Sequence, residues 1–484
     1  MKTASGETGF ATIGDLRGML DRRELSSVEL VSVLLDRLES TGRTLNAIAS
    51  LTTERAYQEA RRADRLLGRG TTSPLLGIPY GAKDIMAARG APTTYGSGAF
   101  RDQWLDFDAA PVQYLRRAGA PLLAKLALEE LTGTGTTDVG VSLQGPGRNP
   151  WRLDLFAGGS SSGSGAAVAA GLLPFALGSD TAGSVAAPAA FCGVTGIRPT
   201  YGLVSRFGSM PVSWSLDRIG VLARTATDCA LVLEAIGRGD RRDPGTANRR
   251  FRRSVDAHVA ARSIRVGYAP RDFDETAEEG IRPPLHAGLD VLRGTGVQIL
   301  EAEIPPGLPY WETLTQIMDG DAASILGPLI DSDRLALVTT EEQREGLRRL
   351  LGTSAREYLD AQRVRARIQL QLRDVFRSVD VLVSYTLAVD ATAYPLDRPA
   401  VSPVMRTGGN AALLGAGNLA GLPGVFVPCG LSSAGMPVGL QFVGRPHSDA
   451  LLLRLAEWFQ ASSAWHTLRP GRMLPDKGGS AEPS

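Results

Sequence analysis

The sequence predicts an α/β protein with a largely buried β-sheet, and three observations support this prediction. The first 70 residues show the apolar spacing of helices. Beyond them, short β-rich runs such as 264–269 and 379–384 alternate with helical runs. Long amphipathic patterns over 354–376 and 449–460 supply helices that can cover a sheet. Such alternation of strands and helices is typical of α/β folds.

The N-terminal helices are predicted from their end signals. Ser26 and Glu29 fit a capping box, in which each side chain bonds the other's backbone N–H. The apolar face of that first helix carries Leu30, Leu34 and Leu38. The core-facing side of a second helix carries Ala56, Ala60, Ala63 and Leu67, and Gly68 is expected as its C-cap.

Composition excludes several classes of function. The chain has 484 residues, is 43% hydrophobic and has a net charge of +1, so neither nucleic acid nor an anionic membrane is expected as a partner. The 3 cysteines and 4 histidines show no metal-ligand spacing, and we expect no metal, no cofactor and no disulfide framework. The N-terminus lacks the apolar run of a signal peptide, so a cytoplasmic location is expected.

An unusual stretch runs from residue 155 to residue 197, where Asp180 is the only charged side chain. At 21% charged residues, about nine would be expected there. The stretch is too rich in glycine and serine for a membrane span, and its run AAVAAGLLPFAL is unlike a flexible linker. We therefore predict a buried centre that packs so closely that its side chains must be small.

Three patches are candidates for chemistry. Lys83 lies in the apolar segment GIPYGAKDIM, where it is either a solvated surface charge or a desolvated base with a low pKa. In AGGSSSGSGAA the hydroxyls of Ser160, Ser161 and Ser162 compete for a role, and GxSxG would make Ser161 a nucleophile. That motif needs a preceding core strand and a downstream acid and histidine, which the sequence does not offer.

The third patch, GSDTAGSVAAPAAFCG, places Ser184 after small residues. Their backbone N–H groups can point at one spot, as an oxyanion hole requires, although a close-packed structural turn explains the same composition.

Together the patches resemble the amidase signature family. The matching residues are GIPYGAKD, GGSSSGSGAA, GSDTAGSVAAPAAFCGVTGIRPTYGLVS and SLDRIGVLART, followed by NLAGLPGVFVPCG and GMPVGLQFVG. The resemblance covers roughly residues 12–460. It implies a large mixed β-sheet core with helices on both faces. It also implies a domain division into an N-terminal helical segment over 1–74, a catalytic domain over 75–470 and a disordered tail over 471–484.

The resemblance also implies a Ser–cis-Ser–Lys triad. Ser184 would be the nucleophile, Ser160 the bridging serine after a cis Gly159–Ser160 peptide, and Lys83 the base. The backbone N–H groups of Thr181, Ala182, Gly183 and Ser184 would form the oxyanion hole, with Gly159 and Asp180 in support. Substrate contacts are expected from Thr134, Gly135 and Thr136.

The chain departs from the family pattern at Ala186, where relatives carry an arginine two residues after the nucleophile. This departure suggests a more neutral or roomier pocket, and the alternative is that another residue fills the space of the arginine. We therefore expect a stand-alone amidohydrolase. Its substrates would be small neutral amides or carbamates (as in a urethanase), aryl compounds included, and it would also have esterase activity. Its partner would be the small-molecule substrate alone, in a monomer or homodimer.

Two alternatives stay open. The first is the catalytic A subunit of a Glu/Asp-tRNA amidotransferase, which would need partner subunits and a glutamine site. The second is a non-catalytic scaffold, which would have no need of the three triad residues.

Overall fold

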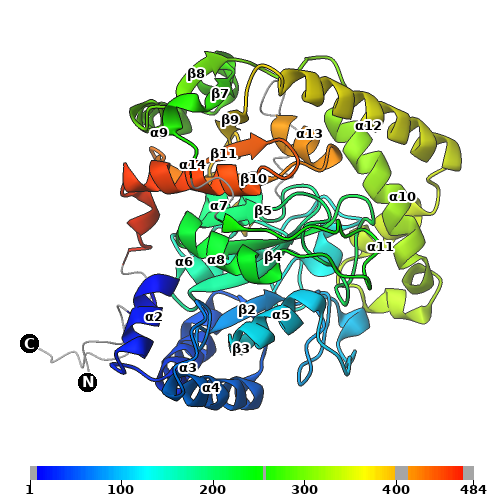
Figure 1. Cartoon of the computed structure of the whole chain (residues 1–484). Coiled ribbons are helices and arrows are strands. Elements are labelled where there is room, and N and C mark those ends of the chain that lie inside the picture. Colours follow the sequence, from blue (N-terminus) through cyan, green and yellow to red (C-terminus); the bar gives the residue numbers. More distant parts are fainter. Residues whose placement is uncertain (1–7, 254–257, 398–411, 472–484) are drawn as a thin grey trace, which may run out of the picture.

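One mixed sheet of 11 strands runs through the computed structural model, which describes residues 8–253, 258–397 and 412–471 (Figure 1). In spatial order the strands are β1 (Ile48–Leu51), β3 (Leu122–Leu126), β2 (Tyr80–Lys83), β4 (Phe175–Asp180), β6 (Arg218–Ala223), β5 (Thr195–Arg198), β10 (Gly424–Leu431), β11 (Pro437–Gly444), β9 (Val381–Tyr385), β7 (Arg265–Tyr268) and β8 (Gln298–Glu301). Pairing is parallel for β3–β2–β4 and for β9–β7–β8, and antiparallel elsewhere. The predicted mixed sheet is confirmed.

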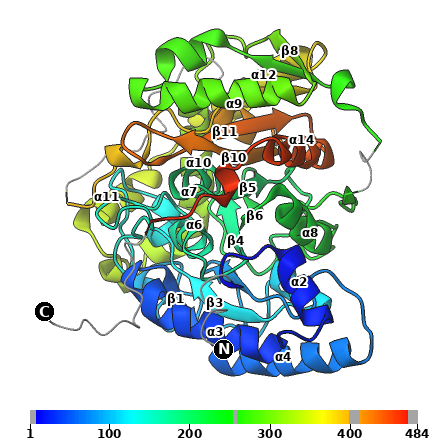
Figure 2. The same cartoon turned by 90° about the vertical axis from the view of Figure 1, so that its left-hand side faces the viewer.

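Helices cover both faces of this sheet, as Figure 2 shows. Thr195 of β5 faces α14, where Gln460 donates to its hydroxyl, whereas the next residue, Gly196, faces Ala189 of α7. Because successive strand residues point to opposite faces, α14 and α7 lie on opposite sides of the sheet. The α-helices are α2 (Ile13–Asp21), α3 (Ser27–Arg37), α4 (Thr53–Gly68), α5 (Ala110–Ala118), α6 (Ser162–Ala169), α7 (Ala186–Cys192), α8 (Ala226–Ile236), α9 (Arg282–Gly294), α10 (Tyr310–Ile330), α11 (Glu341–Leu350), α12 (Ala355–Val375), α13 (Leu413–Leu419) and α14 (Asp449–Ala461).

The elements predicted from sequence patterns are present at their expected places. β7 and β9 occupy the two β-rich runs, and α12 and α14 occupy the two amphipathic runs. The capping box of α3 is confirmed, because the Ser26 and Glu29 side chains each accept the other residue's backbone N–H.

The N-terminal segment differs from the expectation in two details. It holds a strand as well as helices, because β1 pairs antiparallel with β3 at the edge of the sheet. The sequence IASL of this strand has one polar residue and no alternation of polar and apolar side chains, so the pattern does not distinguish it from a helix. Gly68 is the last residue of α4 and not its C-cap, which is Arg69, and Gly70 adopts the left-handed backbone conformation after it. Of the expected tail, residues 472–484 lie outside the described residues.

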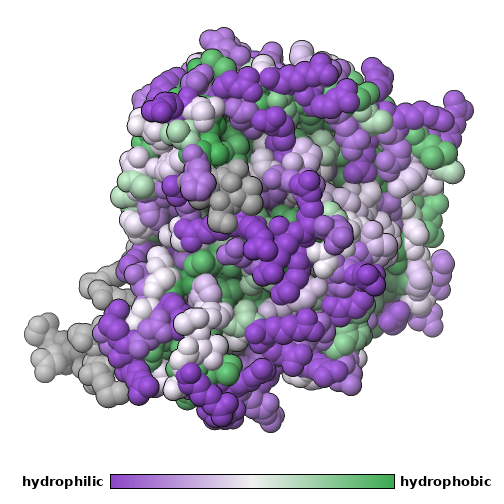
Figure 3. All heavy atoms as spheres, viewed as in Figure 1, coloured by the Kyte–Doolittle hydropathy of each residue, from purple (hydrophilic) through white to green (hydrophobic). Residues whose placement is uncertain are grey.

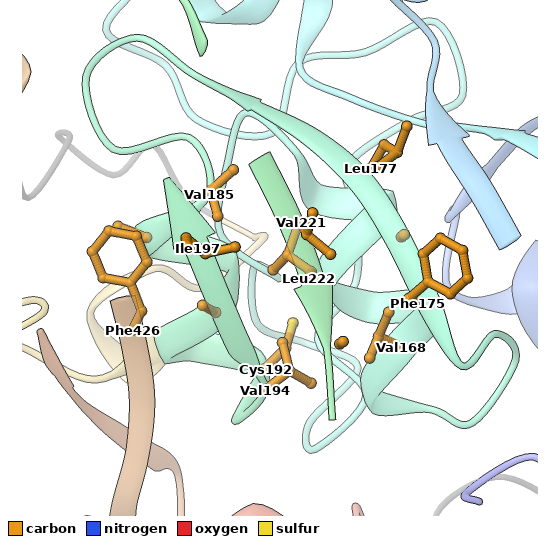
Figure 4. Close-up of a cluster of buried hydrophobic side chains, with 14 of the residues drawn as sticks. Val168, Phe175, Leu177, Val185, Cys192, Val194, Ile197, Val221, Leu222 and Phe426 are labelled. Atoms are coloured by element: carbon orange, nitrogen blue, oxygen red, sulfur yellow. The ribbon is translucent and has the colours of Figure 1, made fainter. Parts of the chain in front are cut away.

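The core is centred on the middle strands of the sheet. Figure 4 shows side chains from three neighbouring strands, among them Leu177 of β4, Val221 of β6 and Ile197 of β5, with Phe426 of β10 beyond them. All four side chains are buried. This packing fixes the positions of the strands. Lys83 at the end of β2 and Asp180 at the end of β4 project from this core.

The small residues of the uncharged stretch allow close approach between backbones. A Cβ atom at Gly163, in the first turn of α6, would lie 2.4 Å from the carbonyl oxygen of Ala47 and 2.7 Å from the amide nitrogen of Ala127. At Gly165, a Cβ atom would lie 2.8 Å from the Pro188 side chain of α7. The close packing predicted from the composition is therefore present where α6 meets β1, β3 and α7.

A buried ion pair secures the end of β2. Lys125 of β3 donates to the Asp84 carboxylate, to the Pro92 carbonyl oxygen and to the Thr93 hydroxyl. Asp84 also accepts the backbone N–H of Thr94 at 3.0 Å. Since Asp84 follows Lys83 directly, this network holds the backbone that presents the Lys83 side chain.

The molecular surface is mainly hydrophilic on the face seen in Figure 3, with small hydrophobic areas between charged side chains. Within the described part of the chain, no helix combines the length and the apolar character needed to cross a bilayer.

Substitution of Gly163 tests the close packing. Gly163→Ala should lower the free energy of unfolding by about 1–3 kcal/mol, because the methyl group meets backbone atoms that cannot rotate away. Urea denaturation followed by circular dichroism measures the change.

The matched control is Gly68→Ala, also in a helix, where a Cβ atom would meet nothing within 4 Å. That variant should be unchanged or more stable by about 0.5–1 kcal/mol, because alanine favours a helix over glycine. Equal destabilisation of the two variants would contradict the packing argument.

Candidate active site

A cavity of about 250 Å³ opens at the ends of the central strands, and Ser160 and Ser184 both line it. Its remaining walls include the Thr181–Gly183 backbone and the aromatic side chains of Phe156, Phe191 and Trp311. The cavity therefore joins two of the three sequence patches, although their serines lie far apart in the sequence.

Lys83, from the segment GIPYGAKDIM, reaches the site from the end of β2. Its side chain is fully buried, and its Nζ atom donates to Ser160 Oγ at 2.7 Å and to Ser179 Oγ at 2.9 Å. Among the alternatives left open for Lys83, the buried position excludes the solvated surface charge. Ser179, on β4, is a contact that the sequence does not reveal, because one serine in a strand carries no distinguishing signal.

Burial lowers the pKa of Lys83 to about 7. The carboxylates of Glu129, Asp180 and Asp217 act in the opposite direction, since nearby negative charge favours the ammonium form. Desolvation outweighs them, so a large fraction of the amine is neutral near pH 7. A neutral amine can accept the Ser160 hydroxyl proton while it donates to Ser179.

Ser160 and its neighbour Ser161 have different surroundings. The peptide bond between Gly159 and Ser160 is cis, as the family resemblance implies. Ser161 is fully buried; its hydroxyl donates to the Ser179 carbonyl oxygen at 3.2 Å and accepts the Ser179 backbone N–H at 3.3 Å. Ser161 thus ties α6 to β4, and its geometry is that of a structural serine and not of an exposed nucleophile.

The Ser184 loop lies directly beside this turn. The Ser161 backbone N–H donates to the Ser184 carbonyl oxygen at 3.3 Å, which keeps the two serine segments together. Ser184 is half-buried and faces the cavity, from which a substrate carbonyl can reach its hydroxyl.

Asp180 organises the loop from below. Its carboxylate accepts the backbone N–H groups of Gly183 at 3.0 Å, Val185 at 2.8 Å and Ala186 at 3.4 Å. The guanidinium of Arg198, also fully buried, lies 4.0 Å from the same carboxylate. The one charge of the uncharged stretch therefore shapes the turn that carries Ser184.

These contacts narrow the set of oxyanion-hole donors. The Gly183 N–H points to Asp180 and is already engaged, contrary to the expectation that it faces the substrate. The backbone N–H groups of Thr181, Ala182 and Ser184 are left as the candidate donors. The Thr181 hydroxyl is held by Asp217 at 2.7 Å, which fixes the backbone at the start of the loop.

The three expected substrate contacts are placed differently from one another. Thr136 lines the cavity, but its hydroxyl donates to Glu342 of α11. Thr134 is buried, and its carbonyl oxygen accepts Gln343 Nε2, while Gly135 packs against Leu347. Besides Thr136, the neighbouring residues that line the cavity are Thr132, Gly133, Thr137, Asp138 and Val139.

Ala186 also differs from its expected position. It is fully buried and is not a lining residue, whereas Ala187 is. The identity of residue 186 therefore does not set the charge of the cavity wall. The cavity instead contains an acidic residue that no sequence motif singles out, Glu129.

No group of three or more His, Cys, Asp or Glu side chains in the described ranges is placed to hold a metal ion. The groups gathered at the site are a buried amine, two hydroxyls and backbone donors, a set suited to acyl transfer through a serine nucleophile.

Comparison with known proteins agrees with this chemistry. The model of the amidase family matches residues 29–453. The A subunit of the glutamyl-tRNA(Gln) amidotransferase of Roseiflexus sp. strain RS-1 is 36% identical, over 95% of this chain and 98% of the relative. The subunit of the same name from Methylococcus capsulatus is 35% identical, over 95% and 98%. The peptide amidase of Stenotrophomonas maltophilia superposes with a TM-score of 0.80 at 30% identity, over 93% of this chain and 96% of that one.

These relatives show that two predictions are wrong. The sequence analysis predicts a stand-alone amidohydrolase for small neutral amides or carbamates, yet the relatives are subunits of an amidotransferase named for glutamyl-tRNA. The expected partners, a small molecule alone with no nucleic acid, in a monomer or homodimer, are contradicted by the same names. A net charge of +1 argues only against RNA binding by this chain's own surface, and a subunit can leave that contact to others.

The pKa of Lys83 predicts how activity depends on pH. If the neutral amine accepts the proton, kcat/KM for a carboxamide should rise about tenfold per pH unit below pH 7 and level off above it. Stopped assays between pH 5 and 9, with circular dichroism at each pH, measure this profile. A profile that falls through pH 7, or is flat across the range, would contradict a neutral Lys83 as the base.

The two candidate nucleophiles can be separated by substitution. Ser184→Ala should lower kcat by at least about 1,000-fold, as loss of a nucleophile does. Ser161→Ala should keep most of the activity and lose stability, because it leaves the Ser179 backbone N–H without its partner. Activity measured beside urea denaturation decides between them, and the reverse pattern would assign the nucleophile to Ser161.

Proposed function

This chain belongs to the amidase family, whose members act on carbon–nitrogen bonds, and from this premise we propose that it is the amide-hydrolysing A subunit of an aminoacyl-tRNA amidotransferase. In this role it releases ammonia from a carboxamide donor, glutamine, and partner subunits transfer the ammonia to glutamyl-tRNA(Gln). The proposal concerns carboxamides and includes no carbamate cleavage. A cytoplasmic location, where aminoacyl-tRNA is used, goes with it.

The observation that carries the proposal is the near full-length similarity to amidotransferase A subunits. The match covers 95% of this chain and 98% of the Roseiflexus relative, so the similarity is not confined to the segments that carry the serines and the lysine. The Lys83–Ser160 hydrogen bond and the shared cavity of Ser160 and Ser184 supply the groups that such a subunit needs.

The proposed reaction begins with proton transfer. The neutral Lys83 amine accepts the Ser160 proton as Ser160 accepts the proton of Ser184. The Ser184 Oγ atom then attacks the carboxamide carbon, and the negative charge on the carbonyl oxygen is stabilised by the N–H groups of Thr181, Ala182 and Ser184.

Collapse of the tetrahedral intermediate breaks the C–N bond. The proton returns through Ser160 to the leaving nitrogen, which departs as ammonia and leaves an acyl-enzyme on Ser184. Water, activated by the same relay, then releases the carboxylate. Amide and water give acid and ammonia, so the step needs no further reactant.

Burial of the relay serves this chemistry. Ser160 is 2% exposed, and Lys83 is fully buried. Few water molecules can therefore reach the Lys83 amine and the Ser160 hydroxyl. The pKa of the amine stays low, and its neutral form can act as a base. A loop tied by Asp180 holds the donors in place before the charge develops, so little reorganisation is required during the reaction.

The test of this function uses the assembled enzyme. The tagged chain is purified from its native host with any bound subunits and is supplied with glutamyl-tRNA(Gln), ATP, and either glutamine or ammonium chloride. We expect amidated tRNA with either donor for the native complex. In the Ser184→Ala complex, glutamine should fail and ammonium chloride should still serve.

The same preparation contains its own control. Rescue by ammonium shows that the assembly and the tRNA are intact in the variant. A chain that purifies alone and hydrolyses amides without amidating tRNA would overturn the proposal.

A further inference from the structure

The active-site cavity is acidic, and no step of the proposed reaction requires its carboxylates. Its lining includes the carboxylates of Glu129 and Asp138 and, within the described residues, no lysine, arginine or histidine. A cavity that binds an anionic substrate group would normally offer a cation to pair with it. This charge distribution instead favours a substrate that carries a positive charge.

Glu129 lies beside the serine turn in this cavity. Its backbone N–H donates to the Ser160 carbonyl oxygen at 3.2 Å, so Glu129 is fixed relative to the bridging serine. One carboxylate oxygen, Oε1, accepts the Gly140 N–H at 2.8 Å. That bond anchors the side chain to the loop that forms the cavity wall.

The second carboxylate oxygen, Oε2, lies beside the serine turn, between two residues that line the cavity, Gly133 and Gly159. A Cβ atom at Gly159 would lie 2.0 Å from Glu129 Oε2, so this oxygen rests against the backbone immediately before Ser160. No hydrogen bond from the described residues reaches Oε2. A carboxylate oxygen in a partly desolvated cavity is a strong acceptor, and an N–H donor of the substrate would satisfy it.

Aromatic side chains complete a cation-binding environment. Phe156, Phe191, Trp311 and Tyr394 line the same cavity, and the rings of Phe191 and Tyr394 lie 5.4 Å apart at 38°. Aromatic faces attract cations through their negative quadrupole. Carboxylate and aromatic walls together suit a primary ammonium group.

We propose that Glu129 is a specificity-determining residue that binds an ammonium group of the carboxamide donor through Oε2. The inference rests on the proposed function and deepens it, because it assigns the α-ammonium of glutamine to this position. For the α-carboxylate, the described residues of the cavity lining offer no cationic partner. Other ammonium-bearing primary amides of similar length should therefore bind as well.

Binding of an ammonium there also suits the base. The Glu129 carboxylate favours the charged form of Lys83. A substrate cation paired with Glu129 offsets this field and thereby favours the neutral amine at the moment when the donor is bound. Burial raises the pKa of the Glu129 carboxyl, and the same substrate cation favours its charged form.

Four related amides test the proposal. L-glutamine carries both α-substituents, 4-aminobutanamide keeps only the ammonium, glutaramate keeps only the carboxylate, and butanamide has neither. Binding to the Ser184→Ala chain is measured by calorimetry, so no amide is consumed. The ammonium should tighten binding at least about tenfold, from butanamide to 4-aminobutanamide, and the carboxylate in glutaramate should not.

Glu129→Gln in the same background should remove the advantage of the ammonium. The glutamine side chain can still accept the Gly140 N–H, and unchanged affinity for butanamide shows that the cavity is intact. Asp138→Asn, which neutralises the other carboxylate of the lining, should retain the preference.

The outcomes separate this inference from the proposed function. Equal affinity for the four amides, tighter binding of glutaramate, or an ammonium preference that survives Glu129→Gln would overturn the assignment, whether or not the complex amidates tRNA. An ammonium preference lost in Glu129→Gln would support it, even for a chain that fails to amidate tRNA.

Discussion

The site depends on keeping the Lys83 amine out of water. In water, with a pKa of 10.5, about one amine in three thousand would be neutral at pH 7. Burial at the end of β2 brings the pKa to about 7 although three carboxylates oppose the change. Close packing of small side chains keeps water away from the amine, and the buried network of Asp84 and Lys125 holds the backbone that presents it.

A second constraint is the single carboxylate that binds the backbone of the Ser184 loop. Asp180 gathers three backbone N–H groups and lies beside the buried guanidinium of Arg198. Removing one partner of a buried charge pair costs about 3–5 kcal/mol, because the other charge is left uncompensated. The loop is therefore held by electrostatics where its small side chains offer little surface for packing. A rigid turn results without bulky side chains in the loop itself.

The fold and the main site residues could be predicted because their signals are local. Lys83, Ser160 and Ser184 each lie in a short patch of unusual composition, and the long helices are periodic over many turns. Ser179 and Glu129 could not be predicted, because each matters only through contacts made across the sheet or the cavity. Thr134 and Gly135 are expected as substrate contacts, Thr134 by its distance along the chain, yet a turn of the loop directs them toward α11. The partners named for the relatives could not be anticipated either, because the net charge of one chain does not describe the surface of an assembly.

The strand order has a consequence for how the protein is made. β5, directly after the nucleophile helix, pairs with β10, and Thr200 bonds Asp449 of α14 across 249 positions of sequence. Contacts between such distant segments slow folding, because a long loop must close before they form. On the ribosome, β5 therefore lacks one of its two neighbours until β10 has been synthesised. A polypeptide that lacks β10 and β11 cannot complete the sheet. Hydrolytic activity is therefore expected only after these strands have been synthesised.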